Sequence, residues 1–142
     1  MSTETSERLL SRLDIRVYYE DTDAGGVMYY ANYLKFFERS RTEWLRHLGV
    51  DQSTYAVQAH RLFVVKDLEI QYRKPARLDD LLSIHSIITR VGPASISFQQ
   101  SAFRNGELLS VSNIQVCCVD ANTLQPAALT PELRTLLKKA KN

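Results

Sequence analysis

The chain has 142 residues, enough for one domain with a substantial core and too few for two. Apolar residues make up 44% and charged residues 24%, with only 5 glycines and 4 prolines, which excludes collagen-like and globally disordered proteins. Eighteen basic and sixteen acidic residues leave a net charge of +2. This charge is too small and too evenly spread to predict nucleic-acid binding.

No apolar run approaches the roughly 20 residues that cross a bilayer, and residues 1–8 lack the layout of a signal peptide. We therefore expect a cytoplasmic protein with no membrane partner. The only cysteines, Cys117 and Cys118, are neighbours in a strand-like segment, so their side chains point to opposite faces and stay free thiols. The three histidines are scattered without metal-ligand spacing, and we expect no metal site.

Residues 1–12 are polar and are expected to form a flexible segment ahead of a domain that spans residues 13–142. The first strand pattern covers residues 13–19, where every second residue is apolar. From about Val27 to Leu48 the apolar period changes to three and four, which predicts a long amphipathic helix that Gly49 ends. Residues 50–60 give no clear pattern.

Four strand-like segments follow, at residues 62–74, 81–91, 94–104 and 107–119. Pro75 ends the first, and Gly92-Pro93 and Asn105-Gly106 are turn signals between the others, so the last three strands should form an antiparallel meander. Residues 130–140 begin with a capping Thr and a Pro, which predicts a short C-terminal helix.

This order of elements predicts an α+β hotdog domain, in which a curved antiparallel sheet of about five strands wraps around one long central helix. A helix of about 20 residues is roughly 30 Å long, and its apolar side must lie against a surface of similar length. A sheet covered on one face leaves its edges and outer face open. We therefore expect a homodimer or a homotetramer.

Residues 18–33, which join the first strand to the helix, carry the densest unusual chemistry. Free N–H groups at a helix start can stabilise negative charge on an oxygen, and the amides of Met28, Tyr29 and Tyr30 are the predicted donors. The adjacent Gly25 and Gly26 would let a ligand approach the backbone closely.

A carboxylate ahead of these amides would complete a hydrolytic pair, because it could attack a carbonyl or activate water. Asp21 and Asp23 are the candidates. An Asp before a helix also serves as an N-cap. The residues alone leave the catalytic and the capping interpretations about equal.

The run Tyr19-Glu-Asp-Thr-Asp-Ala-Gly-Gly-Val27, continued by Tyr30-Ala-Asn-Tyr33 and residues 37–45, resembles the signature of the 4-hydroxybenzoyl-CoA thioesterase family of hotdog acyl-CoA thioesterases. It is most similar to the Tol-Pal system-associated acyl-CoA thioesterase subgroup. The similarity extends over roughly residues 13–138. It implies hydrolysis of acyl-CoA to a free carboxylic acid and coenzyme A. Coenzyme A is then part of the substrate, and no cofactor is needed.

The resemblance further implies that Asp23 is the catalytic carboxylate, as nucleophile or general base, and that the backbone N–H of Tyr30 polarises the thioester carbonyl. The Tol-Pal subgroup usually carries histidine at the position of Tyr30, whereas the hydroxybenzoyl branch carries tyrosine, and a backbone donor is kept in both. The predicted substrate contacts around this pair are Tyr19, Gly26, Val27, Met28, Tyr29 and Tyr33.

The phosphates of coenzyme A require cations near the pocket mouth. Arg73, Lys74 and Arg77 are the predicted ones, with Arg90 and Arg104 as further candidates. Two acids of the predicted helix, Glu38 and Glu43, are instead interpreted as surface residues. They lie close in sequence to Arg39, Arg41 and Arg46, which favours solvated or ion-paired roles.

A different hypothesis is a non-catalytic hotdog module that binds an acyl group or an acyl carrier protein in envelope or lipid metabolism. The complete Asp-Thr-Asp-Ala-Gly-Gly run disfavours it, because binding alone needs no carboxylate at the thioester. A dehydratase of the same fold would need a histidine near the helix start, and none precedes His47. Whether coenzyme A or a carrier protein holds the acyl group stays open.

Overall fold

The computed structural model describes residues 11–141, so residues 1–10 of the expected flexible segment lie outside it. Arg12, assigned to that segment, already begins the first strand. Five strands form one antiparallel sheet in the order β1-β3-β4-β5-β2. They are β1 (Arg12–Arg16), β2 (Arg61–Tyr72), β3 (Leu81–Val91), β4 (Ser95–Arg104) and β5 (Glu107–Asp120).

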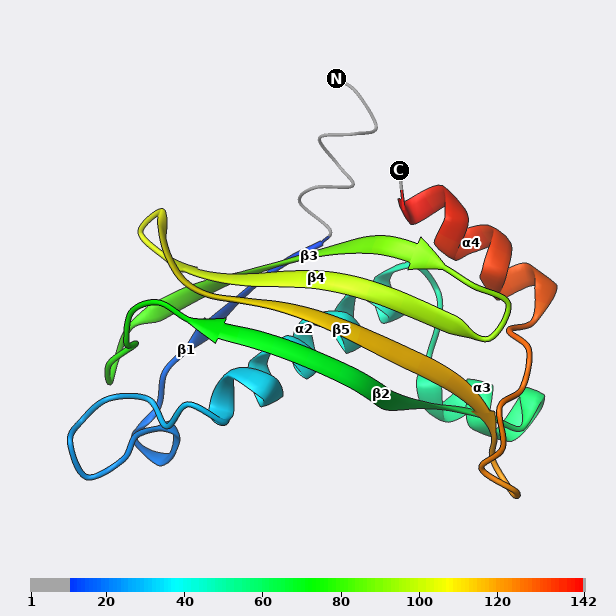
Figure 1. Cartoon of the computed structure of the whole chain (residues 1–142), viewed down its shortest axis with the longest axis horizontal. Helices are drawn as coiled ribbons and strands as arrows, with labels where there is room; N and C mark the ends of the chain where they lie inside the picture. The colour runs from blue at the N-terminus through cyan, green and yellow to red at the C-terminus, as the bar shows by residue number, and fades with distance from the viewer. Residues whose placement is uncertain (1–10, 142) are drawn as a thin grey trace.

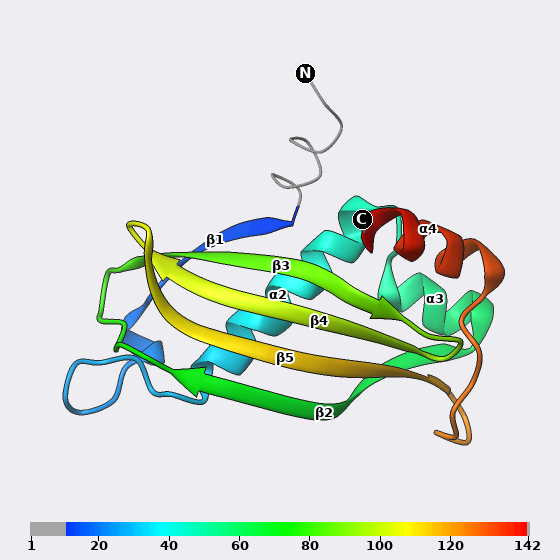
Figure 2. The ribbon, with the colours of Figure 1, turned by 45° about the horizontal axis from the view of Figure 1, so that its top comes forward.

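The long helix α2 (Asn32–His47) lies in the concave face of this sheet, while α3 (Gln52–Ala59) and α4 (Pro131–Lys141) lie together at one end (Figures 1 and 2). The predicted α+β hotdog arrangement and the short C-terminal helix are confirmed. Within residues 11–141, no helix is long and apolar enough to cross a bilayer.

The core lies between α2 and the sheet, and two periodicities meet there. On β3 every second residue from Leu82 to Ile88 is buried, since alternate strand residues share a face. On α2 the fully buried Phe36 and Phe37 recur with Trp44 at helical spacing. Burying large aromatic side chains contributes about 1.5–3 kcal/mol each, which holds the helix to the sheet.

The meander of β3, β4 and β5 is also confirmed. Asn105 and Gly106 both have positive φ angles, of 50° and 81°, which is the conformation of a two-residue hairpin. Gly49, with φ of 96°, follows the end of α2 as predicted.

Two boundaries were wrong, and one helix was missed. β1 ends at Arg16 because residues 19–21 turn into a 3₁₀ helix. The long helix begins at Asn32 instead of Val27, because Val27 and Met28 form β-bridges with Arg77 and Thr22. Helix α3 was missed in residues 50–60, although the Asp51 carboxylate caps it by accepting the N–H groups of residues 53 and 54.

A polar belt, formed by Ser40, Arg41, Ser86 and Gln100, crosses the otherwise apolar interface between α2 and the sheet. The Gln100 amide donates to the Phe37 carbonyl at 2.8 Å and to Ser86 Oγ at 2.7 Å, and Ser86 bonds Ser40 at 2.9 Å. Arg41 Nη1 donates to Gln100 Oε1 at 2.9 Å. Arg41 was predicted only as a charged neighbour of Glu38 and Glu43, and the structure buries it to 8% exposure against the sheet.

Replacing Gln100 with Leu should lower the free energy of unfolding by about 2–4 kcal/mol, because buried partners in the belt and the Phe37 carbonyl would lose their hydrogen bonds. Urea unfolding measures the loss. Gln99→Leu is the matched control, since Gln99 is exposed on the same strand and should cost under about 0.5 kcal/mol. Equal losses in both variants would contradict the role given to the belt.

Candidate functional site

Residues 22–28 form a closed loop between β1 and α2, at the end of the molecule where β2 finishes (Figure 1). The Asp23 N–H donates to the Val27 carbonyl at 2.9 Å, and the Tyr29 N–H donates to the Asp21 carbonyl at 2.9 Å. The Met28 N–H donates to the Ala76 carbonyl at 2.7 Å. Both ends of the loop are therefore fixed by backbone hydrogen bonds, and its exposed tip begins at Asp23.

The two glycines shape this tip around Asp23. The Asp23 carboxylate accepts the Gly25 N–H at 2.9 Å, and a Cβ on Gly25 would lie 3.3 Å from the same oxygen. Gly26 has a φ of 79°, which side-chain-bearing residues rarely adopt. Gly25 and Gly26 thus let the carboxylate of Asp23 fold back over its own loop.

Asp21 and Asp23 occupy opposite environments. Asp21 is 6% exposed, and both its oxygens are engaged: one accepts the Tyr18 N–H at 2.8 Å and the other the Asn32 side-chain amide at 3.0 Å. This carboxylate ties the 3₁₀ helix to the side chain of the first residue of α2, so Asp21 is structural. Neither Asp caps α2 itself, because its N-cap residue is Ala31 and has no side-chain cap. The Asp23 side chain is exposed.

Of the three backbone N–H groups predicted to bind the thioester oxygen, those of Met28, Tyr29 and Tyr30, only that of Tyr30 is free of a hydrogen bond within residues 11–141. Since α2 begins at Asn32, the amides of Met28 and Tyr29 belong to the loop, and both are bonded to carbonyls. The Tyr30 N–H makes no hydrogen bond to any residue from 11 to 141. It lies two residues ahead of α2 and is available to an oxygen of a ligand.

Tyrosines surround this amide. The Tyr30 ring lies 4.8 Å from that of Tyr29 and edge-on to Tyr72 at 5.7 Å, measured between ring centroids. All three are between 44% and 59% exposed. Tyr72, the last residue of β2, was not predicted as a site residue, although its place just before Pro75 puts it at the strand end facing the loop.

Tyr33 lies beneath this group and is only 3% exposed. Its ring contacts that of Tyr72 at a centroid distance of 5.6 Å, and its hydroxyl donates to the Lys74 carbonyl at 3.4 Å. Burial raises the pKa of Tyr33 to about 12. Tyr33 forms the floor under the exposed tyrosines.

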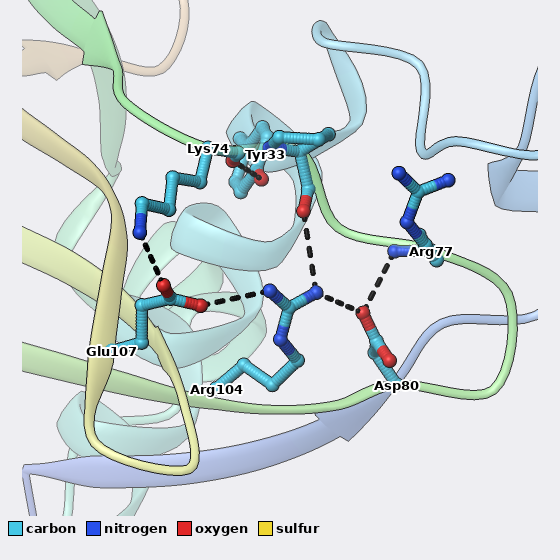
Figure 3. A network of polar contacts seen from close by, with 7 residues as sticks. Tyr33, Lys74, Arg77, Asp80, Arg104 and Glu107 are labelled. Carbon is cyan, nitrogen blue, oxygen red and sulfur yellow. Dashed lines mark hydrogen bonds and ion pairs between the residues drawn. The ribbon is translucent and has the colours of Figure 1, made fainter.

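Ion pairs brace the segment after β2, as Figure 3 shows. Arg104 pairs with Asp80 at 2.7 Å and with Glu107 at 2.9 Å, and Glu107 also pairs with Lys74 at 2.6 Å. Hydrogen bonds from Lys74 and Arg104 lower the pKa of Glu107. Asp80 accepts the Arg77 N–H at 2.8 Å, which fixes the backbone opposite Val27.

The predicted cations differ in availability. The Lys74 ammonium is engaged by Glu107, and Arg104 is engaged by Asp80, Glu107 and the Pro75 carbonyl. Arg73 contacts only the neutral Gln71, at 3.4 Å, and the Arg77 guanidinium has no hydrogen-bond partner within residues 11–141. Arg73 and Arg77 are therefore the exposed cations beside the loop that can meet a phosphate. Arg90 lies on β3, away from this segment in sequence.

The remaining predicted contacts take different positions. Gly26 is exposed at the loop tip, Val27 is half-buried opposite Arg77, and Met28 is 5% exposed in the core. Tyr19 is 82% exposed in the 3₁₀ helix, where its carbonyl accepts the Thr22 hydroxyl at 2.7 Å. The loop and the segments next to it thus carry an exposed carboxylate, an unbonded amide, exposed tyrosines and two cations without ion-pair partners among residues 11–141.

Comparison with known proteins agrees with this chemistry. The model of the family described as "Thioesterase superfamily" matches residues 25–111. The acyl-CoA thioesterase YbgC of Haemophilus influenzae is 48% identical over 120 residues, covering 84% of this chain and 88% of that protein. The acyl-CoA thioester hydrolase YbgC of Escherichia coli is 46% identical over 122 residues, covering 84% and 90%.

Solved structures agree in fold. The crystal structure of a probable thioesterase from Bartonella henselae superposes with a TM-score of 0.80 at 33% identity, covering 83% of this chain and 97% of that one. The DHNA-CoA thioesterase of Staphylococcus aureus has a TM-score of 0.85 at 23% identity, covering 90% and 88%.

Replacing Tyr33 with Phe should make the protein less sensitive to alkali. The raised pKa means that folding favours the neutral phenol, so this stability is complete below pH 10 and is lost as pH rises toward 12. The stability difference between wild type and Tyr33→Phe, measured by urea unfolding, should shift by on the order of 2 kcal/mol across that window. Below pH 10 the difference should stay constant, which is the internal control.

Proposed function

The chain belongs to the thioesterase superfamily and is a thioester hydrolase that acts on acyl-CoA, and we propose that Asp23 is the carboxylate with which it does so. The observation that carries the proposal is the contrast between two neighbouring acids. Asp21 is buried with both oxygens bonded, whereas Asp23 is exposed on a loop closed at both legs. An ionised Asp is the normal state at neutral pH.

The Tyr30 N–H is the proposed donor to the thioester oxygen. Charge develops on that oxygen as the carbonyl carbon becomes tetrahedral, and a fixed backbone donor stabilises it without reorganisation. The bonds that engage Met28 and Tyr29 leave the amide of Tyr30 as the donor on this leg of the loop. The exposed rings of Tyr29 and Tyr72 would flank the acyl group.

Two routes are open to Asp23. As nucleophile, one carboxylate oxygen bonds to the carbonyl carbon, the carbon–sulfur bond breaks, coenzyme A leaves as thiolate, and water then hydrolyses the mixed anhydride. As general base, the carboxylate takes a proton from water, whose oxygen attacks the same carbon. Either route yields a carboxylic acid and coenzyme A.

The carrier end of the substrate is assigned to the exposed cations. Arg73 and Arg77 would bind the phosphates of coenzyme A, while Lys74 would act through its ion pair with Glu107 to hold the segment in place. An acyl carrier protein presents the same thioester on a phosphopantetheine arm and is the alternative carrier.

Within the superfamily, we assign the chain to the 4-hydroxybenzoyl-CoA thioesterase family, near its Tol-Pal-associated subgroup. The Asp-Thr-Asp-Ala-Gly-Gly run and the residues after Tyr30 support the assignment. Cys117 and Cys118 are free thiols, which suits the reducing cytoplasm, where we place the enzyme.

We propose a homodimer formed through β2, with pairs of dimers as the tetrameric alternative. β2 is a 12-residue edge strand paired only with β5, and Val64, Val65 and Leu68 on it are 38–51% exposed. Long apolar edges of this kind pair with another strand. A second copy of β2 would extend the sheet and cover these residues.

Replacing Asp23 with Asn should leave folding intact and lower kcat at least a hundredfold, because the uncharged amide can neither attack the carbonyl nor accept the proton. A thiol-release assay with a panel of short, long and aromatic acyl-CoAs measures the loss. Turnover near the wild-type rate on every substrate would exclude the proposed role. Saturable acyl-CoA binding without turnover by the wild type would instead favour a binding module.

The Tyr30 amide can be tested apart from the tyrosine ring. Tyr30→Phe keeps the backbone donor and should retain kcat within about threefold, whereas Tyr30→Pro removes the N–H and should lower kcat by about 10²–10³. Circular dichroism would check that both variants fold. Comparable activity in the two folded variants would rule out the amide as oxyanion donor.

The proposed dimer can be tested at Leu68. Its side chain is 38% exposed on this edge strand. Leu68→Asp places a charge on the proposed apolar edge and should yield monomers in sedimentation velocity, while Leu68→Ile keeps an apolar side chain and should stay dimeric. A dimer of unchanged affinity in Leu68→Asp would place the contact elsewhere.

A further inference from the structure

We propose that Asp80 and Arg104 are positioning residues for thioester hydrolysis. They hold residues 74–77, called the linker segment here, and this segment fixes the backbone on both sides of the Tyr30 amide. The inference rests on the proposed function, in which Asp23 and Tyr30 act on the thioester. Asp80 and Arg104 act through the backbone and are assigned no contact with the substrate.

The linker segment meets the chain just ahead of Tyr30. The Ala76 carbonyl accepts the Met28 N–H at 2.7 Å, and Arg77 forms a β-bridge with Val27. Ala76 is fully buried, so water does not compete for this hydrogen bond. A shift of the linker segment would therefore move the backbone two residues from the Tyr30 amide.

The same segment meets the chain again just after Tyr30. Tyr33 lies in the first turn of α2, and its hydroxyl donates to the Lys74 carbonyl at 3.4 Å. The Tyr30 amide thus lies between two contacts to one segment. A donor that stabilises a developing oxyanion must already be in place when the charge forms, so the position of the linker segment should affect the rate.

Side chains anchor the linker segment, because residues 75–77 lie outside the sheet ladders, between the end of β2 and the start of β3. Arg104 Nη1 donates to the Pro75 carbonyl at 3.3 Å, and the Asp80 carboxylate accepts the Arg77 N–H at 2.8 Å. The same Asp80 oxygen accepts Arg104 Nη1 at 2.7 Å. Asp80 and Arg104 therefore form one clamp across the segment.

The clamp is built on the sheet and is partly shielded from water. Arg104 is the last residue of β4 and Asp80 directly precedes β3, and their side chains are only 25% and 22% exposed. Figure 3 shows Arg104 between Asp80 and Glu107, with Lys74 on the other side of Glu107. Hydrogen bonds from Asp80 and Glu107 raise the pKa of Arg104. A planar guanidinium can reach several acceptors at once, which an ammonium does less well.

Asp80→Ala opens the clamp and should lower kcat about tenfold to a hundredfold, because a small displacement of groups that act in the transition state costs this much. KM should rise less than kcat falls. Asp79→Asn is the matched control. It removes the same charge at an exposed neighbour whose side chain makes no hydrogen bond within residues 11–141, and Asn tolerates its φ of 71°. Its kcat should stay within about twofold of wild type.

Amide hydrogen exchange measures the same link without using activity. In Asp80→Ala, the Met28 N–H should exchange about fivefold faster or more, because its acceptor moves with the linker segment, while amides in the middle of β4 and β5 keep their wild-type rates. In Asp79→Asn, the Met28 N–H should exchange as in wild type. A folded Asp80→Ala with wild-type exchange at Met28, or with faster exchange but wild-type kcat, would overturn the proposal.

A second pair of variants guards against misfolding of Asp80→Ala. Arg104→Lys keeps the charge but lacks the fork that holds both Pro75 and Asp80, so it should also lower kcat, by about threefold or more. Asp80→Asn keeps one oxygen for the Arg77 N–H and should lie between wild type and Asp80→Ala. Combining Asp80→Ala with Arg104→Lys should cost little more than the worse single change, because both open one clamp. Fully additive losses would contradict it.

The clamp and the proposed catalytic role of Asp23 fail in different measurements. Asp23→Asn leaves Asp80 and Arg104 in place, so its Met28 N–H should exchange as in wild type although turnover is lost. An active Asp23→Asn would overturn the role of Asp23, whereas unchanged Met28 exchange in Asp80→Ala would overturn the clamp. Circular dichroism on each full-length variant, at the temperature of the assay, confirms that folded protein is compared.

Discussion

The structure depends on the burial of one helix in one curved sheet. Phe36, Phe37 and Trp44 of α2 can leave water only where a surface of comparable length exists, and strands β3 to β5 supply it. The proposed site lies where this contact ends, because the loop of Asp23 leads into the start of α2.

The start of the helix is fixed by a carboxylate that takes no part in the proposed reaction. Asp21 bonds both Tyr18 and Asn32, so the chain is held on either side of the loop before Asp23 is reached. The loop can then expose Asp23 without losing its shape. The two acids thus differ in role: the buried Asp21 stabilises the fold, and the exposed Asp23 is the proposed catalytic group.

The middle of the interface carries a polar belt instead of continuous apolar packing. Gln100 satisfies the Phe37 carbonyl, Ser86 and part of Arg41 at once, so the belt is well bonded except at the guanidinium. Burying a charge with so few partners costs stability that an apolar side chain would not.

The sequence by itself determined the class of fold and the meander, because these follow from local periodicity and turn residues, and the resemblance of a contiguous motif predicted the thioesterase activity. Tertiary structure alone decided the rest. The helix begins at Asn32 because Val27 and Met28 pair with Arg77 and Thr22, contacts that no local pattern contains. Burial of Arg41 likewise depends on Gln100, which is 59 residues away in sequence, since exposure is a property of the packed chain.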